Sequence, residues 1–368
     1  MTPEDWEYIY KVNIDKCNEF DYPSELPPVR RIIVLGDIHG DMGVIIKSLK
    51  DVAKVINNDL KWIGEDTVIV QLGDQIDSCR PNGLSCIHNT NDINDTPYDI
   101  KILVFLTQLH EQAQKYGGAV YSLVGNHEIM NVGGNMAYVS YQNIKEFENL
   151  KLLKKKLSKK KLSKKKVLKN VNTIEIDEDY KYDLNIDEIL EKRKLMFRPG
   201  NPIANFLACT RKLVLKIGSN LFVHAGIIDK ISKSYKITEI NRLLALYLRD
   251  TINKKNKEEY HKMMEIINNP EGPLWTRKFS TPFNGKINCD ELLKSLTTYQ
   301  VGRIYVGHTP QIMYDKGING ICDGKIWLTD YGASHAFDTI STISENTNRV
   351  VQVLEILDDN KLTVLKYK

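Results

Sequence analysis

Apolar residues in the first third of this chain alternate between short continuous runs and longer stretches with helical spacing. The runs at 31–35, 67–72 and 119–124 are rich in β-branched and other apolar residues, which is typical of buried strands. The stretch 42–56 places apolar residues three and four apart, and 98–115 is expected to be a second helix. Strands that alternate with helices in this order indicate an α/β fold with a parallel sheet.

Further strand signals occur later in the chain. Two runs at 212–217 and 221–224 flank Gly218-Ser219-Asn220 and predict a hairpin. Further strands are expected, in chain order, at 303–306, 325–329, 350–356 and 362–366. The last two are joined by Asp358-Asp359-Asn360, a turn sequence, so the carboxyl-terminal end is expected to be rich in β-structure.

Short polar motifs directly follow five of these apolar runs. They are G-D-I-H-G at 36–40, G-D-Q-I-D at 73–77, G-N-H-E at 125–128, V-H-A-G at 223–226 and V-G-H-T-P at 306–310. Open α/β sheets collect their sites at the carboxyl ends of the strands. The oxygen and nitrogen donors in the motifs suit hard to borderline divalent ions: Asp37, His39, Asp74, Asn126, His224 and His308. We therefore predict a metal site with these six ligands.

Six donors suffice for two ions. Two ions about 3.5 to 4 Å apart need one carboxylate that reaches both, and Asp74 is the candidate for this bridge. Asp37 and His39, two residues apart on one turn, can ligate one ion, and the remaining three donors can ligate the other. Such a pair lowers the pKa of a water bound between the ions from about 15.7 towards 7, which favours hydrolysis of phosphate monoesters.

One motif histidine is left over from this assignment. His127 is adjacent to the predicted ligand Asn126 but is not required as a ligand itself. It is therefore the candidate acid that protonates the leaving oxygen, with Asp77 orienting its imidazole. Both are predicted catalytic residues.

Other polar residues near the motifs have simpler interpretations. Glu128 is expected to accept hydrogen bonds that orient the G-N-H-E turn. His110 and His261 are expected on helix surfaces, and Trp275 in the core. His88 lies near Cys79 and Cys86, but the absence of a paired C-x-x-C argues against a zinc site.

Composition narrows the setting of these motifs. The chain has 368 residues, of which 42% are hydrophobic, and a formal net charge of +4, which does not by itself indicate a nucleic-acid-binding protein. Its six cysteines show no regular framework and its first ten residues lack a signal-peptide pattern, so we expect an intracellular, cytoplasmic protein. No apolar run approaches the roughly 20 residues that cross a bilayer, so no membrane association is expected.

A lysine-rich repeat is the most unusual segment. Between 151 and 169 the string K-K-K-L-S recurs with a period of five, which matches neither a helix face nor a strand face, and an acid-rich stretch follows at 175–191. The simpler interpretation is a solvated insertion. The alternatives are a nuclear address, or a contact with nucleic acid or another acidic partner.

The five motifs in this order resemble those of calcineurin-like metallophosphoesterases, and specifically the phosphoprotein phosphatase branch. Three further strings are most similar to bacterial-type Shewanella-like phosphatases: G-N-H-E-I-M-N at 125–131, G-P-L-W-T-R at 272–277 and D-Y-G-A-S at 330–334. The resemblance covers residues 30–368, with an extension at 1–29 and a Lys-rich then acidic insertion at 150–192.

The resemblance implies a fold, cofactors and phosphate-binding residues. The implied fold is a four-layer α-β-β-α sandwich with a dinuclear metal site at the carboxyl ends of the strands. The implied cofactors are two divalent ions, with manganese favoured over iron or zinc. Arg277 stands in the family's phosphate-clamp position, and Asn126 is expected to contact the phosphate as well.

Departures from the family pattern bear on the substrate. The second motif of the family commonly continues with an arginine that binds the phosphate, whereas Ser78 and Cys79 follow Asp77 here. The nearest guanidinium is that of Arg80, which is the second candidate for binding the phosphate after Arg277. Ala225 replaces a common glycine. Position 310 is proline, whereas nuclease branches typically carry a second histidine there, which favours the phosphatase branch.

Three functions are compatible with these features. The favoured one is a protein phosphatase that hydrolyses phosphoserine, phosphothreonine or phosphotyrosine in a phosphoprotein or phosphopeptide, by attack of a metal-bridging hydroxide. The alternative is a nucleotide or RNA 5′-end phosphohydrolase of the dinucleoside polyphosphatase type, guided by the lysine repeat. The third is a metal-binding scaffold without activity.

Overall fold

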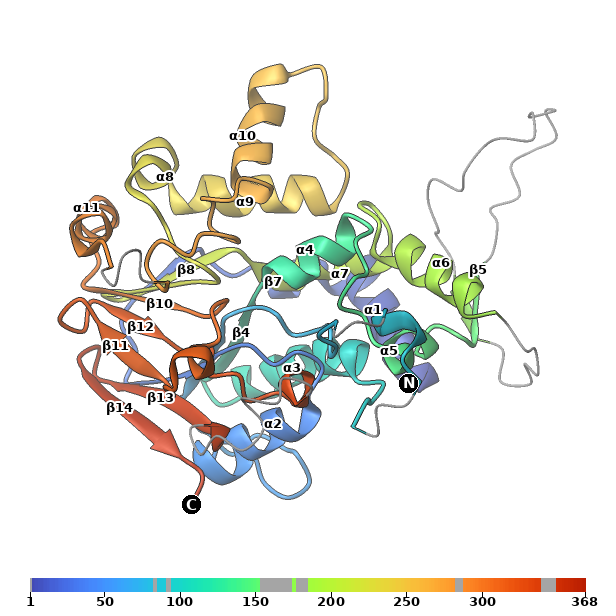
Figure 1. Ribbon diagram of the computed structural model, residues 1–368, viewed down its shortest axis with the longest axis horizontal. Helices are drawn as coiled ribbons and strands as arrows, with labels where there is room; N and C mark the ends of the chain where they lie inside the picture. The colour runs from blue at the N-terminus through green and yellow to red at the C-terminus, as the bar shows by residue number, and fades with distance from the viewer. Residues whose placement is uncertain are drawn as a thin grey trace.

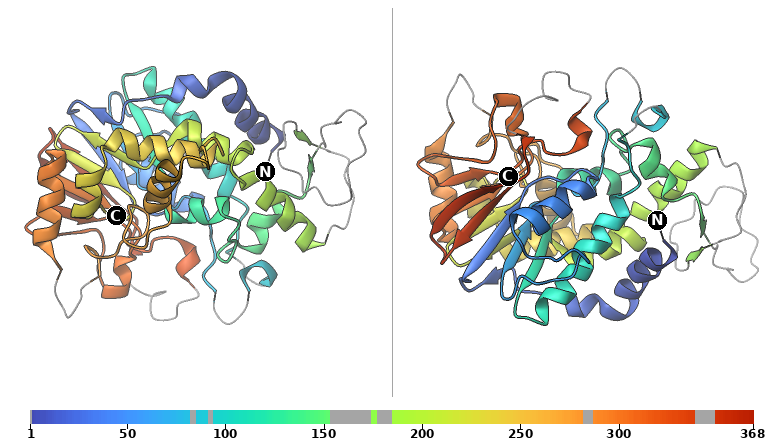
Figure 2. Two further views of the ribbon diagram at one scale, coloured as in Figure 1. Left: turned by 90° about the horizontal axis from the view of Figure 1, so that it is seen from above. Right: turned by 90° about the horizontal axis from the view of Figure 1, so that it is seen from below.

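Two β-sheets packed face to face form the centre of the molecule, which the computed structural model describes for residues 2–81, 85–90, 94–152, 174–176, 185–281, 287–338 and 349–368. Helices cover both outer faces of this sandwich (Figure 1). Viewed from above, Figure 2 presents α9 (Ile237–Leu248) and α10 (Lys257–Ile267), and from below it presents α2 (Met42–Ile46) and α3 (Asp99–Gln114). The predicted four-layer sandwich is confirmed.

The first sheet contains the amino-terminal strands. Its strands are, from edge to edge, β14 (Lys361–Lys366), β13 (Gln352–Leu357), β2 (Arg31–Leu35), β3 (Val68–Gln71), β4 (Ala119–Leu123) and β7 (Arg211–Lys212). The strands from β2 to β7 pair in parallel, whereas β13 is antiparallel to both of its neighbours. The carboxyl ends of β2, β3 and β4 therefore meet at one edge.

The second sheet brings a further set of strand ends to the same region. Its strands are β1 (Glu25–Leu26), β8 (Val214–Ile217), β9 (Asn220–Val223), β10 (Arg303–Val306), β12 (Ile326–Leu328) and β11 (Asn319–Ile321). The three central strands β9, β10 and β12 are parallel to one another. Strands β8 and β9 form the predicted hairpin.

Residues of β2 show how the layers are held together. Ile32 and Val34 belong to the apolar cluster between the sheets, where they join Phe222 of the facing sheet. Ile33 and Leu35 point the other way and pack with residues of α2 and α3. A strand buried on both faces requires a continuous apolar run, and full burial of each such side chain contributes about 1.5–3 kcal/mol.

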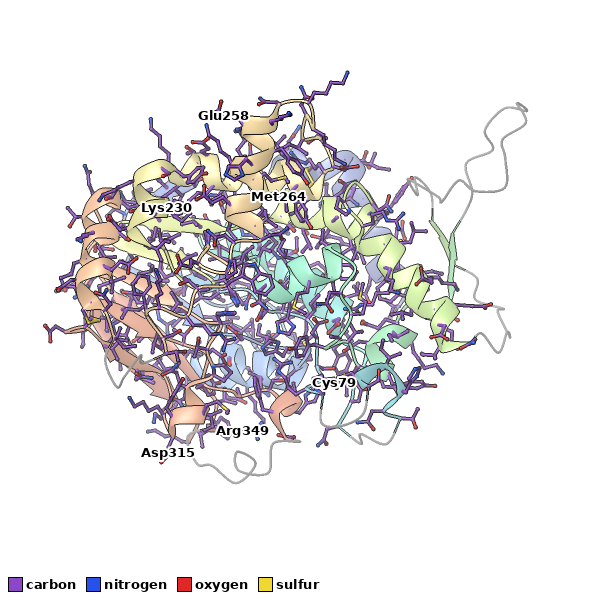
Figure 3. The ribbon with its side chains drawn as sticks, turned by 45° about the horizontal axis from the view of Figure 1, so that its top comes forward. Cys79, Lys230, Glu258, Met264, Asp315 and Arg349 are labelled. Carbon is purple, nitrogen blue, oxygen red and sulfur yellow. A yellow bond between two sulfur atoms is a disulfide. The ribbon has the colours of Figure 1, made fainter. Side chains whose placement is uncertain are left out.

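The remaining helices cluster around the outer face of the second sheet and one end of the sandwich. They are α1 (Pro3–Lys11), α4 (Asn126–Val132), α5 (Tyr141–Lys145), α6 (Ile186–Phe197), α7 (Pro202–Thr210), α8 (Asp229–Ser234) and α11 (Cys289–Tyr299). Short helical turns occur at Val12–Lys16, Cys17–Phe20, Lys47–Val52, Cys86–His88, Gln311–Tyr314 and His335–Phe337, and β5 (Leu150–Leu152) pairs with β6 (Ile174–Ile176). In Figure 3, Glu258 lies at the outer end of α10 and Met264 lies nearer the body.

The predicted strands are present with boundaries shifted by a residue or two, but one predicted helix is shorter than expected. The helix expected over 42–56 ends at Val52, because Lys54 adopts a left-handed backbone with φ of 57°. The extension at 1–29 contains α1, whose Trp6 and Ile9 are buried in the largest apolar cluster. The limits of the extension and of the insertion stay predictions.

His110 was expected on a helix surface, and this prediction is wrong. Its side chain on α3 is buried, and its Nδ1 lies 3.0 Å from the backbone oxygen of Val120 on β4. Its α3 neighbours Leu106, Leu109 and Ala113 are also buried, so this face of the helix lies inward. His261, on α10, is exposed as predicted.

All six cysteines form disulfides, in contrast to the expectation from the sequence. Cys17 pairs with Cys209, Cys79 with Cys86, and Cys289 with Cys322. Sequence separations of 192, 7 and 33 residues leave no regular spacing by which to recognise the pairs. The Cys79–Cys86 bond also removes both thiols that a zinc site near His88 would need.

The lysine repeat and the membrane prediction are compared with the structure next. The lysine repeat at 151–169 lies outside the described residues, except that 151–152 belong to β5. Among the helices that the structure describes, none is both long and apolar enough to cross a bilayer.

Candidate metal centre

The predicted ligands come from the carboxyl ends of parallel strands in both sheets. Asp37 and His39 follow β2, Asp74 follows β3, and Asn126 follows β4 in the first sheet. In the second sheet, His224 follows β9 and His308 follows β10. All six side chains are buried. The edge where the two sheets meet therefore gathers donors that are up to 271 positions apart in the sequence.

Asp74 is at the centre of this group. Its Oδ2 atom lies 3.3 Å from His224 Nε2, 3.8 Å from His127 Nε2 and 3.9 Å from His39 Nε2. Two sets of donor atoms that share Asp74 lie within 4.8 Å of one another: one joins it with His39 and His127, the other with His224 and His308. One carboxylate thus faces two clusters of ligand atoms, the arrangement that a bridge between two cations requires.

Asn126 belongs to the second cluster. Its Oδ1 atom lies 2.8 Å from His224 Nε2 and 2.8 Å from His308 Nδ1. The backbone N–H of His308 donates to Asp37 Oδ2 at 2.9 Å, which links the β10 loop to the β2 loop. The structure thus brings all six predicted ligands together.

Asp330 is a site residue that the sequence analysis did not identify. It follows β12, is 2% exposed and lines the same pocket as Asp74 and His308. Burial raises the pKa of Asp330 to about 6. Its sequence signal is that D-Y-G-A-S, like the ligand motifs, directly follows a predicted strand.

The charges of the site fit a cation. Asp37 Oδ1 and Asp330 Oδ2 are buried without hydrogen-bond partners. Burial, together with the charges of Asp330 and Asp74, raises the pKa of Asp37 well above its usual range. Burial lowers the pKa values of His39 and His308 well below the usual range, which keeps both imidazoles in the neutral form that ligates metals. Crowded carboxylates with free oxygens beside neutral imidazoles are the donor set that divalent ions satisfy.

Local backbone conformation explains the glycines of the motifs. A Cβ atom at Gly125 would overlap the carboxylate of Asp74, and one at Gly307 would overlap that of Asp37. Asp74 and His308 themselves have positive φ values of 52° and 67°. Non-glycine residues in this region carry strain of about 1–3 kcal/mol, and they concentrate at functional sites.

His127 and Asp77 form the predicted pair. His127 Nδ1 lies 2.8 Å from Asp77 Oδ2, which leaves Nε2 directed towards Asp74. Glu128 accepts hydrogen bonds from the backbone N–H groups of Asp74, Gln75 and Gly125 at 2.7 to 3.0 Å. The prediction that Glu128 orients this turn is confirmed, because it ties the β4 loop to the β3 loop.

Both candidate phosphate-binding arginines line one pocket of about 600 Å³ together with four of the predicted metal ligands, His39, Asp74, Asn126 and His308. Arg277 is exposed, and its Nε lies 3.2 Å from His308 Nε2. Arg80 donates to the backbone oxygens of Asp77 and Cys79 at 3.2 and 2.9 Å, and its guanidinium lies over the ring of Phe337 at 4.6 Å. Arg80 is therefore present in the pocket, although it stands three positions after Asp77 rather than one.

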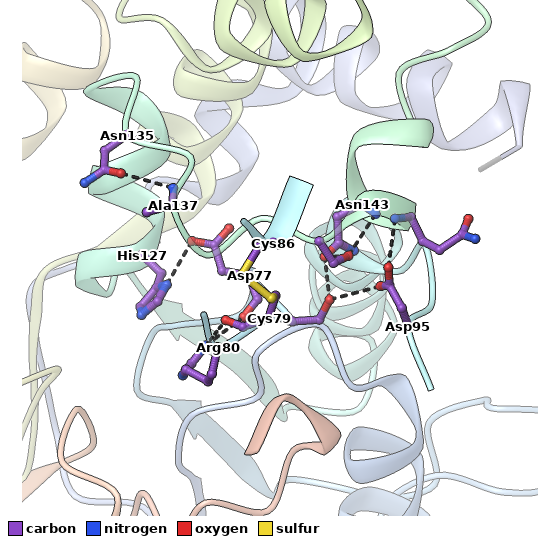
Figure 4. Close-up of a disulfide and its surroundings, with 12 residues drawn as sticks. Asp77, Cys79, Arg80, Cys86, Asp95, His127, Asn135, Ala137 and Asn143 are labelled. Carbon is purple, nitrogen blue, oxygen red and sulfur yellow. Dashed lines mark hydrogen bonds and ion pairs between the residues drawn. A yellow bond between two sulfur atoms is a disulfide. The ribbon is translucent and has the colours of Figure 1, made fainter. Parts of the chain in front are cut away.

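Aromatic side chains complete the pocket walls. Tyr138 has its ring 4.9 Å from that of His127, and Trp275, expected in the core, is half-buried and lines the pocket. In Figure 4, the Cys79–Cys86 disulfide lies immediately beside Arg80, and a dashed line joins Asp77 to His127. The loop that carries Arg80 is thus covalently tied next to the His127–Asp77 pair.

The chain is similar in sequence to proteins of a known family. A model of the calcineurin-like phosphoesterase family matches residues 30–311. The uncharacterized protein R398 of Acanthamoeba polyphaga mimivirus is 32% identical over 286 residues, which cover 72% of this chain and 99% of that protein. Shewanella-like protein phosphatase 2 of Arabidopsis thaliana is 28% identical over 308 residues, which cover 83% of this chain and 71% of that protein.

A solved structure shows the same fold. The cold-active protein-tyrosine phosphatase of a Shewanella species matches with a TM-score of 0.60 and 22% identity. The match covers 94% of this chain and 83% of that one.

Proposed function

Since the chain belongs to the calcineurin-like phosphoesterase family and is a hydrolase of phosphate esters, we propose that it is a metal-dependent protein phosphatase. The main support for this proposal is one pocket that Asp74, His127, Arg80 and Arg277 line together, with the buried Asp77 hydrogen-bonded to His127. These are the groups that phosphoryl transfer requires for charge neutralisation, orientation and protonation.

The family uses two divalent ions, and this chain offers residues to hold both. In the proposed assignment, Asp37 and His39 would hold one ion, Asn126, His224 and His308 would hold the other, and Asp74 would contribute to both. When bound, the ions supply an activated water and neutralise charge on the phosphoryl oxygens. Manganese is the metal that we propose.

The phosphate and the leaving group are handled by side chains of the pocket. The guanidinium groups of Arg277 and Arg80 supply paired N–H donors to the phosphoryl oxygens, and Asn126 is proposed to contact the phosphate as well. His127 donates the proton from Nε2, because its Nδ1 is held by Asp77. Asp77 keeps the imidazole in this orientation.

The proposed substrates are phosphoproteins. The relatives from Arabidopsis thaliana and Plasmodium berghei are named as phosphatases of the Shewanella-like protein phosphatase type, and Pro310 lines the pocket where nuclease branches typically carry a histidine. Phosphoserine, phosphothreonine and phosphotyrosine are all candidates.

A substrate panel tests this proposal. Purified protein with added manganese is expected to release phosphate from phosphopeptides, and chelation of the metal is expected to abolish this release. The panel contains matched phosphoserine, phosphothreonine and phosphotyrosine peptides and a dinucleoside polyphosphate. A preference for the dinucleoside polyphosphate that weakens when 151–169 is deleted would contradict the proposal and favour the nucleotide hydrolase.

Opening the Cys79–Cys86 disulfide is expected to weaken substrate binding. The bond restrains the loop that carries Arg80. Without it, part of the binding free energy is lost in ordering the Arg80 guanidinium each time a substrate binds. The variant with Cys79→Ser and Cys86→Ser should raise KM for a phosphopeptide by roughly 10-fold, equivalent to about 1.4 kcal/mol, with a smaller effect on kcat.

The matched control for this variant removes a different disulfide. Cys289 and Cys322 lie in α11 and after β11, and neither lines the pocket. Their replacement by serine is expected to lower the melting temperature without changing KM. Equal effects of both disulfides on KM would contradict a specific role for the Arg80 loop.

The cellular compartment remains a prediction. The sequence led us to expect an intracellular, cytoplasmic protein, whereas disulfides form and persist mainly in oxidising environments. The three pairs in the structure therefore support a compartment that is more oxidising than the cytosol.

A further inference from the structure

A fully buried arginine lies behind the catalytic pair, on the side away from the pocket. Arg193 of α6 is 0% exposed, although arginine is seldom fully buried in proteins. Its guanidinium lies over the rings of Phe147 and Phe197, with centroids at 5.4 and 5.0 Å, and Nη1 donates to the backbone oxygen of Asn143 at 3.1 Å. Such a group is retained only where its remaining N–H donors have strong partners.

The other donors of Arg193 surround Asp77. Nη2 donates to Asp99 Oδ2 at 2.7 Å and lies 3.5 Å from Asp77 Oδ1. Nε donates to Asn131 Oδ1 at 3.0 Å, and the amide of Asn131 donates to both oxygens of Asp77, at 2.9 and 3.0 Å. Both Asp77 oxygens are therefore held by groups that Arg193 orients.

The ring of hydrogen bonds closes through the backbone of Asp77. Asp99 accepts from the backbone N–H of Asp77 through Oδ1 at 3.1 Å, while its other oxygen accepts from Arg193. Asp77 itself has a φ of 74°, a conformation that non-glycine residues adopt only under constraint. Backbone and side chain of Asp77 are thus fixed from α3, α4 and α6 together.

We propose that Arg193 is a positioning residue for proton donation by His127, acting through Asn131 and Asp99 on Asp77. A purely structural ion pair would involve Asp99 alone. In this structure Nε of Arg193 also donates to Asn131, whose side-chain amide donates to both oxygens of Asp77. This inference rests on the proposed function, because it assigns His127 the protonation of the leaving oxygen.

The planar guanidinium is essential to this arrangement. Lysine carries the same charge but lacks the fork that reaches Asp99 and Asn131 at once. Arg193→Lys therefore keeps a cation beside Asp99 but removes the hydrogen bond to Asn131. The side chains of Asn131 and Asp77 are then no longer fixed in position. A second variant, Asn131→Ala, removes the relay and leaves the Arg193–Asp99 pair intact.

The test uses substrates that differ in how much they need an acid. Full-length variants, loaded with manganese, are assayed on phenyl phosphate, whose leaving phenol has a pKa of about 10, and on 2,4-dinitrophenyl phosphate, whose phenolate leaves without a proton. Both variants should lose roughly 10- to 100-fold in kcat on phenyl phosphate, because small misplacements of catalytic groups cost up to about 100-fold. The loss on the dinitrophenyl ester should stay below about 3-fold.

Combination with His127→Asn gives a second readout. If Arg193 acts through His127, Arg193→Lys should cost nothing further on phenyl phosphate once His127 has been replaced. Leu190→Ala on the same helix is the control for general destabilisation, and it should affect both esters equally.

The outcomes separate the inference from the function on which it rests. Equal losses on both esters, or losses that add to that of His127→Asn, would overturn the positioning role and leave a structural ion pair. Absence of turnover on either ester by the unmodified protein would contradict the proposed function and the inference with it.

Discussion

Asp74→Asn is expected to reduce phosphatase activity by roughly 10⁴-fold or more, equivalent to about 5 kcal/mol of transition-state stabilisation. Asp74 Oδ2 faces His39, His127 and His224 within 3.9 Å, so it is the one carboxylate oxygen that both ligand clusters share. An amide at this position has one neutral oxygen and cannot bridge two cations as a carboxylate does. Activity on a phosphopeptide and the metal content of the purified variant measure the effect.

The variant is expected to fold normally. Asp74 Oδ1 accepts from the backbone N–H of His127 at 2.9 Å, and an asparagine oxygen can accept the same bond. Replacement also relieves the repulsion among the buried carboxylates Asp37, Asp74 and Asp330. Asp66→Asn, at an exposed carboxylate paired with Arg30, is the matched control and should retain full activity. An active Asp74→Asn protein with unchanged metal content would contradict the assignment.

His127→Asn is expected to lower kcat on phosphoserine peptides by about 10² to 10⁴-fold, the usual contribution of a general acid. The alkoxide of serine is a poor leaving group, and in this site its proton comes from His127 Nε2. Asparagine leaves the start of α4 at Gly125 in place, but its side chain carries no proton that it can transfer to the leaving oxygen. The measurement compares kcat on a phosphoserine peptide with kcat on an activated aryl phosphate.

The effect should depend on the substrate. The activated aryl ester needs no acid, so kcat of His127→Asn on this ester should stay close to that of the unmodified protein. Such a result would also show that the variant still binds its metals. His261→Asn, at an exposed histidine on α10, should leave both substrates unaffected. A uniform loss on both substrates would assign His127 to metal binding, as its proximity to Asp74 and His39 allows.

The motif residues could be predicted from the sequence because each follows a strand of recognisable pattern. A continuous apolar run such as that of β2 identifies a buried parallel strand, and its carboxyl end places Asp37 and His39 at the sheet edge. Since β9 and β10 end at the same edge, His224 and His308 reach Asp74 across the two sheets. Local patterns were sufficient there, because the topology of parallel sheets gathers their carboxyl ends.

Features that depend on distant partners could not be predicted in this way. The cysteine pairs join segments without a repeating interval, and Arg193 is buried only because α6 packs against α4, α5 and α7, so that its side chain reaches Asn131 and Asp99. His110 lies on α3, whose buried residues extend around more of the helix than an amphipathic pattern predicts. Each of these depends on which elements meet in space, and helical or strand periodicity carries no information about that.

Crystals grown with manganese provide the most direct test of the shared carboxylate. We expect two anomalous-scattering peaks in the pocket, both in contact with Asp74, one beside Asp37 and His39 and the other beside Asn126, His224 and His308. A pocket without peaks, or a single ion that does not touch Asp74, would contradict this expectation.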